Sequence, residues 1–62
     1  MPLNEMQRQE LCEYIEELLD LYSEDEYENY LENIVYHYCN RKYDIEREES
    51  TKLLYQIIQE LS

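Results

Sequence analysis

Residues 11–35, LCEYIEELLDLYSEDEYENYLENIV, hold two amphipathic segments separated by a helix-start signal. Within each segment, apolar residues recur three and four positions apart, which is the spacing of one face of an α-helix. In the first segment they are Leu11, Tyr14, Ile15, Leu18, Leu21 and Tyr22. In the second they are Tyr27, Tyr30, Leu31, Ile34 and Val35, and the same spacing continues to Tyr38 beyond the quoted stretch. The stretch therefore predicts two consecutive helices.

The helix-start signal is Ser23-Glu24-Asp25-Glu26. Ser23 can cap the free N–H groups of the new helix, and Glu26 can reach back to the Ser23 backbone. Tyr22 and Tyr27 flank this box and can pack together as a hydrophobic staple. A connection of one or two residues forces the two helices to run antiparallel. We expect the first helix at about 5–21, capped by Asn4 and Gln7, and the second at about 24–39.

A third helix follows after a break in the pattern. The break is Asn40-Arg41-Lys42-Tyr43, which places cations at the negative end of the second helix. Apolar spacing then returns, which predicts a helix at about 45–61 with an inner face of Leu53, Leu54, Ile57, Ile58 and Leu61. Its start is open, because Asp44 could cap a long helix and Ser50 a short one. Ile45 lies off the stripe, and we interpret it as a residue that docks where the helix begins.

Length and composition favour a single all-α domain over residues 1–62. The 62 residues include 0 Gly, so tight turns with positive φ are costly and β-hairpins are disfavoured. We expect a small three-helix domain, an antiparallel helical hairpin with a third helix packed against it. A chain this short buries only about 60% of its unfolded surface. Its core is therefore thin, and we expect a homodimer in preference to a monomer.

The formal net charge of −11 is the strongest clue to function. It disfavours direct binding to nucleic acid, because phosphates repel carboxylates, and it disfavours anionic membranes for the same reason. The first two thirds of the chain carry most of the imbalance, since Arg8 is the only Lys or Arg before Arg41. Such a field suits a partner protein with a basic surface. The alternative is an acidic surface that only keeps the chain in solution.

The sequence gives little support for catalysis or for metal binding. There is 1 His and no Gly-rich phosphate loop, and a domain this small has little interior for an active site, so we do not expect an enzyme. His37 and Cys39 are two positions apart and would point in different directions on a helix, so we expect no metal and no cofactor. We interpret Cys12 and Cys39 as packing thiols in a cytoplasmic protein, because neither a membrane-spanning stretch nor a signal peptide is visible.

The candidate partner-binding residues lie on the polar faces of the first two helices. The carboxylates are Glu13, Glu16, Glu17 and Asp20 on the first helix, and Asp25, Glu28 and Glu32 on the second. Tyr36 lies away from the apolar stripe among acidic and amide side chains. An exposed tyrosine with a polar rim is typical of a binding hot spot, although single exposed aromatic residues are also common.

These features predict a small acidic inhibitor or neutralising protein. Its carboxylates would cover a basic site on a target, including the nucleic-acid-binding site of a nuclease or polymerase, by matching the spacing of phosphates as a DNA mimic does. Immunity proteins, antitoxins and anti-defence proteins share this combination of size, charge and helicity. The alternative is a structural or regulatory adaptor, in which the apolar stripe of the third helix dimerises or docks into the groove of a helical partner.

Overall fold

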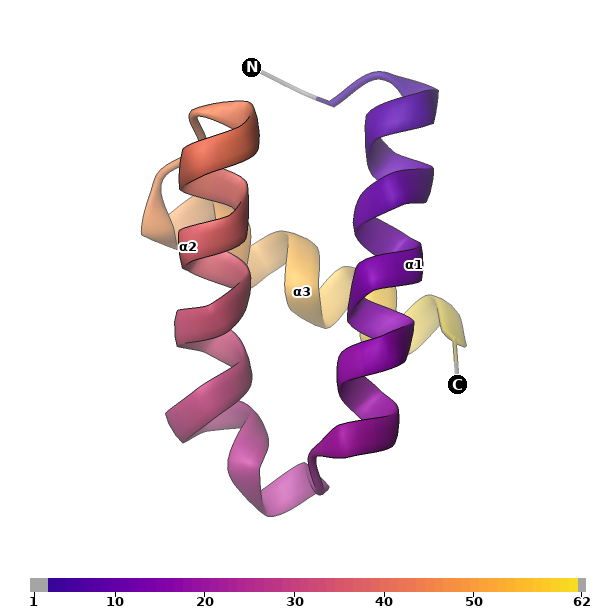
Figure 1. The fold of residues 1–62 in the computed structure, drawn as a ribbon, viewed down its shortest axis with the longest axis vertical. Coiled ribbons are helices and arrows are strands. Elements are labelled where there is room, and N and C mark those ends of the chain that lie inside the picture. The colour runs from indigo at the N-terminus through magenta and orange to yellow at the C-terminus, as the bar shows by residue number, and fades with distance from the viewer. Residues whose placement is uncertain (1–2, 62) are drawn as a thin grey trace.

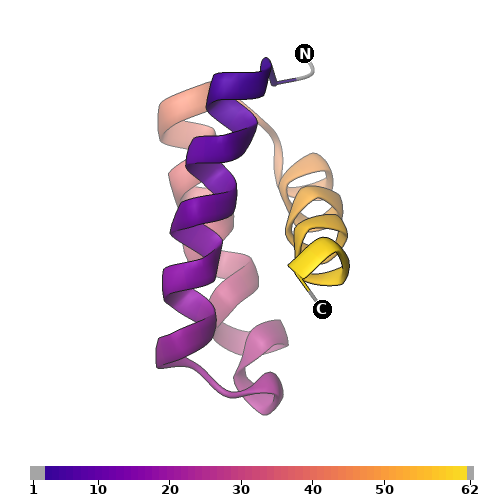
Figure 2. The same cartoon turned by 90° about the vertical axis from the view of Figure 1, so that its right-hand side faces the viewer.

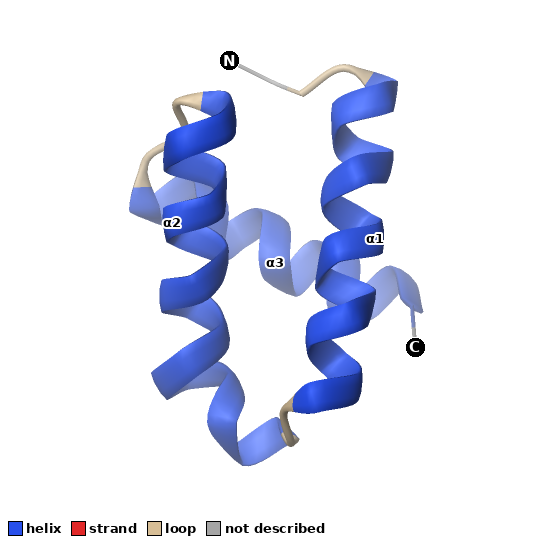
Figure 3. Cartoon of the chain, viewed as in Figure 1, coloured by secondary structure: helices blue, strands red, loops and turns tan. Residues whose placement is uncertain are grey.

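The computed structural model describes residues 3–61, and they form three α-helices with an irregular segment between the first two (Figures 1 and 3). In chain order the elements are α1 (Glu5–Leu21), a short 3₁₀ helix η1 (Glu24–Glu26), a π-helical turn η2 (Tyr27–Leu31), α2 (Glu32–Tyr43) and α3 (Arg47–Leu61). Residues 3–61 contain no strand. The predicted all-α class is confirmed.

The helices form two layers. α1 and α2 run antiparallel in one layer, and α3 crosses behind both of them (Figure 1). The view turned by 90° shows α3 on one side of the α1–α2 layer and no helix on the other side (Figure 2). The predicted hairpin with a third packed helix is therefore correct, and one broad face of the hairpin is left uncovered.

The core lies between the two layers and is built largely from the predicted apolar stripes, although Leu21, Tyr30 and Leu61 of those stripes are exposed because they lie at or near helix ends. Its buried hydrophobic residues are Leu11, Ile15, Leu18, Leu31, Val35, Cys39, Ile45, Leu54 and Ile57. Ile45 is buried just before α3, as predicted. Ser50 is also fully buried, and its hydroxyl donates to the Arg47 carbonyl over 2.9 Å, so this buried polar group has a partner.

α1 begins and ends where the sequence predicts. The Gln7 N–H donates to Asn4 Oδ1 over 2.8 Å, and the Asn4 N–H donates to Gln7 Oε1 over 3.2 Å. These reciprocal bonds are the predicted capping box, and they satisfy N–H groups that have no partner inside the helix.

The start of the second helical segment is less regular than predicted. The Ser23 N–H and hydroxyl both donate to Glu26 Oε1, over 3.0 and 3.1 Å, which confirms the contact expected of Glu26. The chain reverses directly after α1, and the Glu26 N–H bonds to the Ser23 carbonyl in a tight 3₁₀ turn. A wider π turn follows, so the uninterrupted helix expected over 24–39 is wrong at its beginning.

The end of α2 is also different, because the predicted break at residues 40–43 is helical. Tyr43 holds this last turn in place: its ring meets Tyr38 edge-on at 5.8 Å between centroids, and its hydroxyl donates to Glu10 over 2.6 Å. Arg41 and Lys42 do lie at the negative end of the helix, as expected. The helix stops at Asp44, whose φ of 57° and ψ of 43° are left-handed.

α3 begins at Arg47, between the two starting points that the sequence left open. Asp44 terminates α2 and does not start a long α3. Ser50 is a core residue inside the helix and is not its cap.

Candidate functional site

Four predicted carboxylates project from the side of α1 that faces away from the core. Leu11, Ile15 and Leu18 are buried, and this places Glu13, Glu16, Glu17 and Asp20 on the exposed side of the helix. The ion pairs found within residues 3–61 use other carboxylates, those of Glu10, Glu48 and Glu60. The acids on this side of α1 therefore have no cation from the described chain to neutralise them.

Two further predicted carboxylates lie in the turn between α1 and α2. Asp25 and Glu28 are exposed in η1 and η2, directly after α1. We call the six residues Glu13, Glu16, Glu17, Asp20, Asp25 and Glu28 the acidic face. The cations gather elsewhere: Arg8, Arg41 and Lys42 lie where α1 begins and α2 ends, the end opposite the α1–α2 turn (Figure 1). The hairpin is thus electrically polarised along its length.

Glu32 lies apart from the acidic face. It is half-buried, and its carboxylate accepts a hydrogen bond of 2.6 Å from the Tyr55 hydroxyl on α3. That bond, together with burial and the negative charge of Glu32, raises the pKa of Tyr55 to about 12. Glu32 therefore joins α2 to α3.

Tyr36 is not the exposed ring that the sequence suggested. It is half-buried, and the Arg47 guanidinium lies 4.4 Å from its ring centroid. The same guanidinium donates to Asn33 Oδ1 over 2.9 Å. The expectation of a ring surrounded by carboxylates is wrong because the fold brings a cation from the start of α3 over the aromatic face. This is a cation–π contact that secures the α2–α3 corner.

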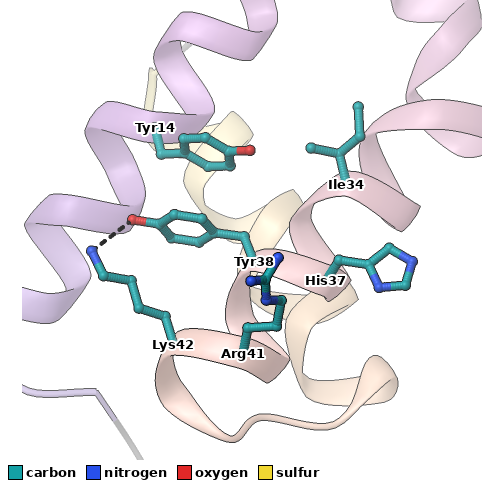
Figure 4. Close-up of a pocket in the computed structure, with 6 residues that line it drawn as sticks. All are labelled: Tyr14, Ile34, His37, Tyr38, Arg41 and Lys42. Atoms are coloured by element: carbon teal, nitrogen blue, oxygen red, sulfur yellow. Dashed lines mark hydrogen bonds between the residues drawn. The ribbon is translucent and has the colours of Figure 1, made fainter.

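An aromatic groove, which the sequence analysis did not predict, opens between α1 and α2 on the face away from α3. It has a volume of about 590 Å³ and is lined by Tyr14, Ile34, His37, Tyr38, Arg41 and Lys42 (Figure 4). Tyr14 and Tyr38 stack across it with centroids 4.0 Å apart and planes 12° apart. Tyr22 and Tyr30 stack nearer the turn, at 6.0 Å. We call the surface formed by the six lining residues the tyrosine groove. From the sequence, all four rings are expected on the apolar stripes of the two helices.

The two sides of the tyrosine groove differ in charge. On its α1 side, Glu10 bonds to Lys42 over 2.7 Å, and Glu17 contributes its negative charge to the environment of Tyr14. On its α2 side lie His37, Arg41 and Lys42. The hydrogen bond from Lys42, helped by one from Tyr43, holds the pKa of Glu10 below its usual value.

The thiols are placed for packing. Cys39 is fully buried, and burial raises its pKa to about 11, which keeps the thiol protonated at neutral pH. Cys12 is half-buried, and both cysteines are free thiols. Among residues 3–61 no group of three or more His, Cys, Asp and Glu is arranged to hold a metal ion. None of the helices described is both long and apolar enough to cross a membrane.

Comparison with protein-family models, curated proteins and solved structures yields no match to this chain. Its function is therefore inferred from the chemistry of its surface.

Proposed function

We propose that this protein is an acidic inhibitor or neutralising protein that binds a basic site on another protein and blocks it. The observation that carries the proposal is the acidic face, whose six carboxylates form no ion pair within residues 3–61. Like charges held close together repel one another, so the free protein carries an electrostatic cost that a basic partner relieves. The same field accelerates encounter with such a partner.

The basic site belongs to a protein that handles nucleic acid, such as a nuclease or a polymerase. Glu13, Glu16, Glu17 and Asp20 present negative charge in a row along a rigid helix, as phosphates do along a strand. A preformed helix loses little conformational freedom on binding, which favours affinity. In this role the protein resembles immunity proteins, antitoxins and anti-defence proteins in action. It binds its target and catalyses no reaction.

An adaptor is the second candidate, and the structure changes which surface would serve it. The apolar stripe on α3, which the sequence predicted as a docking surface, faces the protein's own core. Leu54 and Ile57 are buried, and Leu53 and Ile58 pack against the core. The tyrosine groove, by contrast, is open on the uncovered face of the hairpin and is lined in part by Tyr14, Ile34 and Tyr38. An adaptor role would rest on that groove.

Capture of partners from the native cell, followed by mass spectrometry, tests the proposal. The wild-type bait should retain a basic protein that elutes as salt rises, because salt screens exposed charge. A bait with Glu13→Gln, Glu16→Gln and Asp20→Asn should lose it. The matched control carries Glu46→Gln, Glu48→Gln and Glu49→Gln, the same charge change at exposed positions in and beside α3, and should retain it. A partner that binds all three baits equally would refute the proposal.

A further inference from the structure

We propose that the tyrosine groove binds a second copy of this chain. In the resulting dimer, α1 and α2 of the two copies form a four-helix bundle with two-fold symmetry. This inference does not rest on the proposed function. Glu17 of the acidic face would lie in the dimer interface, whereas Glu13, Glu16 and Asp20 lie on the outer side of α1 and stay exposed in such a dimer. The dimer would present two sets of these outer carboxylates.

Each helix of the hairpin carries a second seam besides its core stripe. On α1 the seam is Glu10, Tyr14, Glu17 and Leu21, and on η2 and α2 it is Tyr30, Ile34, His37 and Arg41. Both sets repeat at intervals of three and four residues, the spacing by which one helix pairs with another. Leu21 and Tyr30, near the turn, are 76% and 53% exposed. Large apolar side chains thus lie exposed near the α1–α2 turn.

The distribution of charge beside the groove favours one orientation of the second copy over another. Glu10 and Glu17 lie beside the groove on α1, and His37, Arg41 and Lys42 line it on α2; Glu10 and Lys42 already pair over 2.7 Å within one chain, so Glu17 and Arg41 carry the unpaired charge. A two-fold axis parallel to the helices lays α1 of each copy against α2 of the other, so acidic side meets cationic side twice. A two-fold axis across the helices would lay α1 against α1 and set carboxylates against carboxylates. The first arrangement is complementary and the second is repulsive.

The heights of the residues agree with the first arrangement. The stacked rings of Tyr14 and Tyr38 mark the same position along the axes of the antiparallel helices α1 and α2. At about 1.5 Å per residue, Leu21 lies roughly 10 Å from that position toward the turn and Tyr30 roughly 12 Å in the same direction. Rotation about an axis parallel to the helices preserves height, so Leu21 of each copy meets Tyr30 of the other. Glu10 and Arg41 lie roughly 6 and 4.5 Å from the same position in the opposite direction, and they meet in the same way.

Sedimentation equilibrium over about 10 to 500 µM, at roughly 0.15 M salt to screen the net repulsion, tests the dimer. Wild-type protein should reach twice the chain mass of 7.8 kDa. Leu21→Glu should raise the dimer Kd at least about tenfold, because it buries a carboxylate in an apolar seam. Its helical circular dichroism should not change, because Leu21 is outside the core.

Matched controls separate this surface from others. Leu61 is a 38% exposed leucine on α3, and Leu61→Glu should leave the dimer intact. Arg41→Glu should weaken the dimer, whereas Lys52→Glu, with the same charge change on α3, should not. Wild-type protein that stays monomeric throughout the concentration range would overturn the proposal. So would a loss of dimer in Leu61→Glu as large as that in Leu21→Glu, which would assign the interface to α3.

Discussion

Asp44 reverses the chain between α2 and α3 at a conformation that costs most residues energy. Its φ of 57° is the only positive value among the non-glycine residues described. The Asp44 N–H donates to the Cys39 carbonyl five residues back, and the Ile45 N–H donates to the same carbonyl over 3.3 Å, so these bonds close the end of the helix. Asp tolerates left-handed backbone better than most residues do, although less well than Gly. The chain has 0 Gly, so it makes this turn with a tolerated residue and not the preferred one.

Replacing Asp44 by Gly should therefore stabilise the protein. We expect Asp44→Gly to raise the free energy of unfolding by about 0.5 to 1 kcal/mol, because relief of the left-handed backbone outweighs the extra freedom of Gly in the unfolded chain. Asp44→Ala should lower it by about 1 kcal/mol, since Ala has neither Gly's freedom nor Asp's local hydrogen bonding. Urea denaturation of the three proteins measures both changes. A less stable Asp44→Gly would show that the Asp side chain contributes more than its backbone costs.

Among the elements, α1 was predictable at both ends and α2 at neither. The Asn4–Gln7 capping box and the change of pattern at Ser23 are local signals, and local signals are visible in sequence. The last turn of α2 is held by Tyr43, whose partner Glu10 lies on α1. Tyr43 and Glu10 are 33 residues apart in sequence, so their contact is not visible in the local spacing of apolar residues. The polar residues at 40–43 therefore led to a predicted helix end that is too early.

The corner between α2 and α3 depends on a contact of the same long-range kind. Arg47, the first residue of α3, covers Tyr36 and bonds to Asn33. Tyr36→Ala should lower the free energy of unfolding by about 1 to 2 kcal/mol, because it removes ring packing together with the cation–π contact. If Tyr36 were instead an exposed binding residue, Tyr36→Ala would change the free energy of unfolding by less than about 0.5 kcal/mol.

A double-mutant cycle with Arg47→Met isolates the contact between the two side chains. We expect a coupling energy of about 0.5 to 1 kcal/mol between Tyr36→Ala and Arg47→Met, measured by urea denaturation. Additive effects of the two changes would mean that the guanidinium and the ring contribute independently, and α3 would then need another anchor at its start.

For the whole molecule, the sequence predicted which side chains would be charged and exposed better than it predicted what surrounds them. Spacing alone placed Glu13, Glu16, Glu17 and Asp20 on the outer side of α1, and they are exposed. The surroundings of Glu32 and Tyr36 were wrong because α3 supplies their partners Tyr55 and Arg47. The tyrosine groove was missed for a related reason: periodicity shows that tyrosines face the neighbouring helix, but not that this side of the layer is left open.

The stability of the whole molecule depends on pH through two paired carboxyls, those of Glu10 and Glu60. The hydrogen bond with Lys42 lowers the pKa of Glu10, and that with Arg8 lowers the pKa of Glu60, from the ordinary 4.5. A carboxyl with a lowered folded pKa stabilises the protein fully above its unfolded pKa, and this contribution is lost as pH falls through the folded value.

The melting temperature should therefore fall below about pH 4 as Glu10 and Glu60 take up protons. Thermal melts followed by circular dichroism between pH 7 and about pH 3 measure the profile. The variant with Glu13→Gln, Glu16→Gln and Asp20→Asn should melt higher at pH 7, because fewer like charges then repel one another on the acidic face. Glu10→Gln should melt lower than wild type at pH 7, and the difference should shrink as the pH falls through the folded pKa of Glu10. A triple variant that melts no higher than wild type at pH 7 would mean that the electrostatic cost assigned to the free protein is absent.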